Sequence, residues 1–172
     1  MLVLLAALAA DPSPLATPFT AEQIRGAMPV GAHIALEVRE RAGTTRLDWT
    51  VLTADADGMT WRSNIDPPGA EDPPAAERAA TWVELEQHAS FPADHATRRR
   101  ASVRTPWGRL DGWRYDVHEA NAQGEDVFMR LWFADAIPGP PVRMISIGPG
   151  GARSELVQIV RDPLPSAPAG SR

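Results

Sequence analysis

Residues 107–118, WGRLDGWRYDVH, alternate between apolar and polar side chains and predict a β-strand. Trp113, Tyr115 and Val117 would point to one face of a sheet, and the residues between them to the other, because successive side chains on a strand point to opposite sides. The same alternation recurs in eight further segments: 33–41, 45–53, 59–61, 80–91, 97–104, 126–134, 142–147 and 153–161. Short Gly- and Asp-containing turns separate most of them.

This pattern predicts a mainly β (α+β) fold, built as a curled antiparallel sheet or an open half-barrel of about eight to ten strands. One helix is predicted over residues 20–28 and is expected to pack on the sheet. Thr20 and Gln23 have the spacing of a capping box, and Pro29 and Gly31 follow the helix. The Pro-rich segment 64–78 is expected to be a surface loop with a short helical piece at 74–79.

Length and composition indicate a single β-rich domain at residues 19–161 of the 172-residue chain, followed by a disordered tail at 162–172. The sequence contains no cysteine and no lysine, which excludes a disulfide scaffold, a thiol nucleophile and a P-loop. The formal net charge of −5 argues against a nucleic-acid partner. The basic run Arg98–Arg100 is therefore expected to be a solvated surface feature.

The N-terminal residues 1–10, MLVLLAALAA, resemble the end of a secretory signal peptide, with Ala7–Ala9 as the cleavage motif. This run is too short to cross a bilayer as a helix, so no integral membrane span is expected. Residues 11–18 form a Pro-rich spacer that we expect to be extended and mobile. The predicted location is periplasmic or secreted.

Some predicted strands are apolar on both faces. In 126–134, Phe128 and Trp132 lie opposite Leu131 and Phe133, and Trp82 falls among acidic residues on the outer face of its predicted strand. Such strands predict that a helix and loops cover the second face, that a protein partner does, or that this face lines a hydrophobic groove. Trp132, Phe128 and Trp82 are the candidate ligand-binding residues. Three other tryptophans alternate in phase with the inward-facing apolar residues of their strands and are expected in the core: Trp49, Trp61 and Trp113.

Catalytic and metal-binding patterns are weak. The four histidines stand alone, and Asp116 with His118 and Glu119 offers too few converging ligands for a metal ion. The acidic residues are scattered singly on outward positions, which gives no acid–base pair. We therefore predict no catalytic residue, no metal and no cofactor.

Four short motifs in residues 105–147 resemble a known family. Thr105–Gly108 precedes a strand that contains Gly112–Val117, and Leu131–Ala134 and Pro141–Met144 follow in that order. This order is similar to the periplasmic lipoprotein-carrier superfamily (LolA/LolB-like) and its exported relatives. The resemblance implies an open β-barrel of about ten antiparallel strands closed over a helix, with an apolar cavity for acyl chains. It implies no catalytic residue.

The leading functional hypothesis is a non-enzymatic exported β-domain that binds an apolar ligand, an acyl chain or a lipoprotein in a hydrophobic groove. One alternative is a structural or protein-interaction module with a filled core. Another is a hydrolase whose catalytic groups come together only in the folded chain.

Overall fold

The computed structural model describes residues 13–67 and 75–164. In these residues, nine strands form one antiparallel sheet that stays open, which confirms the predicted fold class. The elements are α1 (Ala21–Ala27), β1 (His33–Glu40), β2 (Gly43–Ala54), β3 (Gly58–Asp66), β4 (Ala75–Thr81), α2 (Trp82–Gln87), β5 (Ala96–Thr105), β6 (Gly108–Ala120), β7 (Asp126–Ala134), β8 (Arg143–Ile147), the 3-10 turn η1 (Pro149–Gly151) and β9 (Arg153–Asp162).

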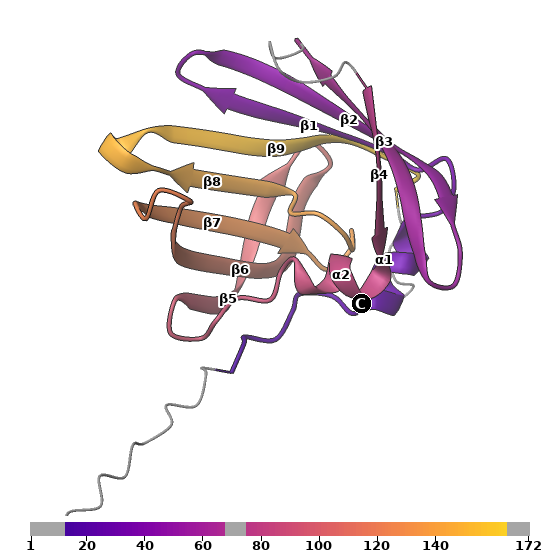
Figure 1. The fold of residues 1–172 in the computed structure, drawn as a ribbon. Coiled ribbons are helices and arrows are strands. Elements are labelled where there is room, and N and C mark those ends of the chain that lie inside the picture. The colour runs from indigo at the N-terminus through magenta and orange to yellow at the C-terminus, as the bar shows by residue number, and fades with distance from the viewer. Residues whose placement is uncertain (1–12, 68–74, 165–172) are drawn as a thin grey trace, which may run out of the picture.

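The strand order is β4-β3-β2-β1-β9-β8-β7-β6-β5, so the sheet consists of two meanders joined in the middle. β1 to β4 form one meander and β5 to β9 form the other. β1 pairs with β9, with Leu36 opposite Gln158 and Ile34 opposite Arg161, and a register shift lies between these two pairs. Figure 1 shows the resulting curled sheet, with both helices gathered at one end.

The main core lies between the helices and the sheet face that points toward them, which we call the concave face. α1 begins as predicted: the Thr20 side chain accepts from the Gln23 backbone, and the Gln23 side chain accepts from the Thr20 backbone. Ile24 on α1 and Phe133 on β7 are buried in this core. The three in-phase tryptophans also pack against it, as expected, although they are only partly buried.

Two local predictions are wrong. The expected helical piece at 74–79 is the strand β4, and the expected strand at 80–91 contains the helix α2. β4 is rich in alanine, but pairing with β3 overrides that helix propensity. In α2, Thr81 and Glu84 form a second capping box, which starts a helix where the alternation of residues indicated a strand.

The opposite, convex face carries a second, smaller core. Val103, Ala134, Ile137 and Val142 are buried there, and Trp132 packs against them. The segment between β7 and β8 supplies Ile137 and Val142, so the chain that follows β7 covers the second apolar face of that strand. The sequence predicts that both the 20–28 helix and Pro-rich loops cover the second apolar face of these strands. In the structure, the Pro-rich loop after β7 covers the convex face, whereas the helix α1 covers the concave face.

The segment before α1 is attached to the domain. The Leu15 backbone N–H donates to the Phe91 carbonyl at 2.8 Å, and the Tyr115 hydroxyl donates to the Ala16 carbonyl at 2.6 Å. The predicted signal peptide at residues 1–10 and most of the predicted tail lie outside the described residues, whereas Asp162 belongs to β9. None of the helices in the described ranges is long and apolar enough to cross a membrane.

Candidate functional site

An apolar pocket lies between the two helices and the concave face of the sheet. Its volume is about 280 Å³. Both helices, strands from both meanders and the loop after β7 contribute to its walls. The lining residues are Ile24, Met28, Trp49, Met59, Trp61, Leu85, His88, Ala89, Leu131, Phe133, Gly139, Pro140 and Pro141.

The helices contribute side chains at helical spacing. Ile24 and Met28 are four residues apart and therefore lie on one side of α1 and its C-cap, facing the sheet. Leu85 reaches the pocket from α2, together with Ala89 just beyond that helix. The helical conformation of residues 82–87 is therefore what brings Leu85 to the site.

Aromatic rings form the sheet side of the pocket. Trp49 on β2 and Trp61 on β3 have ring centroids 6.4 Å apart in a tilted arrangement. Phe133 packs edge-on against Tyr115, with centroids 5.6 Å apart. The indole N–H of Trp61 is buried and has no hydrogen-bond partner among the described residues. The pocket lining is therefore apolar, and one of its residues carries an indole N–H that donates no hydrogen bond to the described residues.

A buried arginine lies behind the loop side of the pocket. Arg161 on β9 is 3% exposed, and its Nη2 donates to the carbonyls of Ala27 at 2.7 Å and Pro138 at 3.0 Å. Burial lowers the pKa of Arg161 to about 10, so the guanidinium is still charged at neutral pH. Its Nε and Nη1 atoms have no partner among the residues described.

The structure does not bring the three sequence-predicted ligand residues together. Trp82 lies in α2, is 4% exposed, and donates its indole N–H to the Asp55 carbonyl at 3.0 Å. Phe128 and Trp132 point to the convex face, away from the pocket, because they alternate with Leu131 along β7. Their role in ligand binding stays a prediction.

The sequence interpretation missed most of the pocket residues. Trp49 and Trp61 are in phase with the core, and nothing in the alternation distinguishes a core residue from one that faces a cavity. Leu85 was placed on a strand. The Thr81–Glu84 capping box was the sequence feature from which α2, and hence Leu85, was recognisable.

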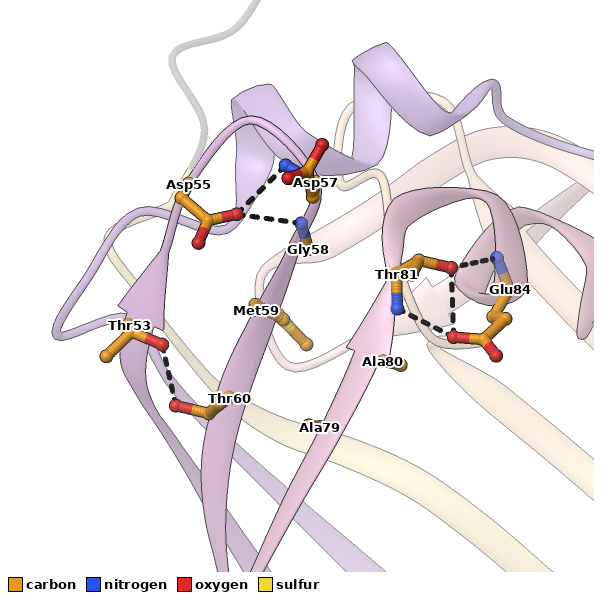
Figure 2. Close-up of a pocket in the computed structure, with 10 residues that line it drawn as sticks. All are labelled: Thr53, Asp55, Asp57, Gly58, Met59, Thr60, Ala79, Ala80, Thr81 and Glu84. Carbon is orange, nitrogen blue, oxygen red and sulfur yellow. Dashed lines mark hydrogen bonds between the residues drawn. The ribbon is translucent and has the colours of Figure 1, made fainter.

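A second depression, of about 340 Å³, lies at the β2–β3 turn beside α2 (Figure 2). Its two hydrogen-bonded carboxylates stabilise local structure. Asp55 accepts from the backbone N–H groups of Asp57 and Gly58, and Glu84 accepts from the N–H of Thr81. These backbone bonds lower the pKa of both Asp55 and Glu84. We therefore assign this depression a structural role.

Several charged groups elsewhere in the described residues form ion pairs. On the convex face, Asp116 accepts from Arg114 and from Arg130 Nε, the latter at 2.6 Å. His33 Nε2 lies 2.8 Å from Asp48, which also pairs with Arg46 at 2.7 Å. Within residues 13–67 and 75–164, no three His, Asp or Glu side chains gather in a way that could hold a metal ion.

Comparisons with known proteins give one distant structural neighbour to report. No family model matches the sequence, and no curated protein matches it. Among solved structures, the chain is similar to a domain from Vibrio parahaemolyticus that has been assigned to outer membrane lipoprotein sorting. The identity is 9% and the TM-score 0.28, over 88% of this chain and 92% of that one. A similarity this distant carries no argument about function.

Proposed function

We propose that the protein is a non-enzymatic binding domain that holds one acyl chain in the pocket between α1, α2 and the concave face. The observation that supports this is the apolar lining of the pocket, where Trp49, Trp61 and Phe133 meet Ile24 and Leu85. Apolar walls with a few polar groups are typical of small-molecule sites. Each apolar group that leaves water for this pocket contributes about 25 cal/mol per Å² of buried surface.

The pocket volume limits what fits. At about 280 Å³ it lies just below the range of about 300–1,000 Å³ that ligand pockets occupy. This favours a ligand with a single chain over one with several. The apolar residues 1–10 support a further part of the proposal, namely that the domain acts outside the cytoplasm, in the periplasm or after secretion.

The test is a titration with a neutral apolar probe, N-phenyl-1-naphthylamine, whose fluorescence rises on leaving water. We expect the wild-type chain to bind it. Trp61→Ala removes part of the pocket wall and should weaken binding about tenfold, which corresponds to about 1.4 kcal/mol. Trp132→Ala is the matched control, because it removes the same side chain from the convex face and should leave probe binding unchanged.

Urea unfolding of each variant checks that the chain is folded during the titration. Absence of probe binding by the wild type would overturn the proposal and favour a structural module with a filled core. Loss of binding in Trp132→Ala but not in Trp61→Ala would place the ligand on the convex face instead.

A further inference from the structure

Arg161 is a buried charge with no counter-charge among the residues that the structure describes. Its Nη2 donates to the carbonyls of Ala27 and Pro138, and its Nε and Nη1 have no hydrogen-bond partner in the same residues. No Asp or Glu side chain of the described residues lies within ion-pair distance of Arg161. Burial of a charge is costly unless the charge is paired, so this arrangement calls for an anion.

Nη1 of Arg161 lies near Gly139, which lines the pocket. A Cβ placed on Gly139, which lines the pocket, would lie 3.5 Å from Arg161 Nη1 and 2.6 Å from the Cε of Met28. The guanidinium therefore lies close to a pocket-lining residue, and the flexible end of the Met28 side chain lies beside that residue. A ligand whose polar end displaces the end of the Met28 side chain would approach Nη1.

Gln158 is a second polar side chain on the same strand that has no side-chain hydrogen bond within residues 13–67 and 75–164. It is fully buried, and its Nε2 and Oε1 atoms both have no hydrogen-bond partner among the described residues. Gln158 pairs with Leu36 and Arg161 with Ile34, and both partners belong to the main core. Residues directly opposite in a ladder share a face, so Gln158 and Arg161 occupy neighbouring positions on the concave face of β9.

We propose that Arg161 binds the carboxylate of a fatty acid whose hydrocarbon tail occupies the pocket. This inference rests on the proposed function and adds the class of ligand. One guanidinium carries one positive charge, which a carboxylate balances. A phosphate monoester carries a charge of about −1.5 to −2 at neutral pH and would leave negative charge buried without a partner.

The experiment measures displacement of N-phenyl-1-naphthylamine by dodecanoate, dodecanol and dodecyl phosphate at pH 7. We expect dodecanoate to bind about tenfold more tightly than dodecanol, and more tightly than the phosphate. NMR of carboxyl-¹³C dodecanoate should show a lower pKa for the bound acid than for the free acid, because the guanidinium stabilises the carboxylate.

Two variants separate recognition from general charge. Arg161→Gln should abolish the preference for dodecanoate over dodecanol and return the carboxyl pKa toward its free value. Arg153→Gln is the matched control, since it removes an exposed positive charge from the same strand and should preserve the preference. If Arg161→Gln does not fold, the comparison of ligands on the wild-type chain decides.

The outcomes distinguish the two proposals. Equal binding of dodecanoate and dodecanol by the wild type overturns the role of Arg161 while the apolar pocket stands. Tighter binding of dodecyl phosphate overturns the assignment to a carboxylate. If neither the probe nor any dodecyl ligand binds, the proposed function fails, and this inference fails with it.

Discussion

The aromatic side chains that line the pocket have different surroundings from those on the convex face. On the convex face, arginines lie over the rings, with Arg143 Cζ 5.3 Å from the centroid of Trp132 and Arg130 Cζ 5.3 Å from that of Phe128. Both arginines also pair with carboxylates. Solvated guanidinium groups thus complete the packing of this surface.

On the concave face, Arg98 lies over Trp113, with its Cζ 3.4 Å from the ring centroid. No arginine of the described residues lies over Trp49 or Trp61. These rings border the pocket, and Arg161 has no carboxylate partner in the part of the chain that the structure describes. An aromatic residue out of phase with the core therefore does not by itself indicate a ligand site. Paired arginines can cover such a residue, as Arg143 covers Trp132 on the convex face.

The largest expected difference between the faces is in stability. Phe133→Ala should lower the free energy of unfolding by about 3–5 kcal/mol, because the ring is buried between Tyr115 and Phe19. Phe128→Ala, on the same strand but half-buried on the convex face, should cost less than half as much. Urea unfolding of the two variants measures both values, and equal losses would contradict the assignment of the main core to the concave face.

The convex face should respond to pH through Asp116. Burial raises the pKa of this carboxyl, but hydrogen bonds from Arg130 and Arg114 outweigh burial and hold its pKa below the ordinary value. A lowered pKa in the folded state stabilises the protein above the unfolded pKa of about 3.9, and this contribution is lost as the pH falls through the folded value.

Asp116→Asn should therefore lower the free energy of unfolding by about 1–2 kcal/mol at pH 7, and the loss should shrink below about pH 4. Urea unfolding at a series of pH values measures the difference from wild type. Asp126→Asn, at an exposed position on β7, is the control and should show no such trend. A constant difference at all pH values would mean that the charge of Asp116 contributes nothing.

The smallest expected loss of stability concerns α2, the helix that contains the pocket residue Leu85. Thr81→Ala removes the side chain that caps this helix and should cost about 1 kcal/mol. Thr81→Ser keeps the hydroxyl and should cost clearly less. If alanine and serine are equivalent in thermal unfolding, the cap does not stabilise the segment, and the position of Leu85 depends on its packing alone.

Alternation of residues was sufficient to predict most of the sheet, since eight of the nine strands in the described ranges fall on predicted segments. It failed for residues 75–87, where two local preferences compete. Alanine-rich β4 is a strand because β3 offers it hydrogen bonds, and α2 is a helix because Thr81 and Glu84 cap it. Pairing partners far along the chain are not visible in a local pattern.

The candidate site was less predictable than the sheet, because it too depends on contacts between segments that are far apart in the sequence. The sequence located the apolar strands but not which of their faces the helices would cover, and it therefore favoured Trp132 over Trp61. No sequence pattern around Arg161 distinguishes it from an exposed arginine on a strand. Its burial depends on Ala27 and Pro138, which come from two other parts of the chain. A site of this kind exists only in the assembled fold.

The pairing of β1 with β9 also has a consequence for the order of folding. Each meander consists of neighbouring hairpins, which close short loops and form quickly, but the central pair joins Leu36 to Gln158. During synthesis β1 must wait for the last described strand, so one of its edges stays unpaired while the rest of the sheet is made. The centre of the finished sheet is therefore the last part to form, and until then it is the part most open to wrong partners.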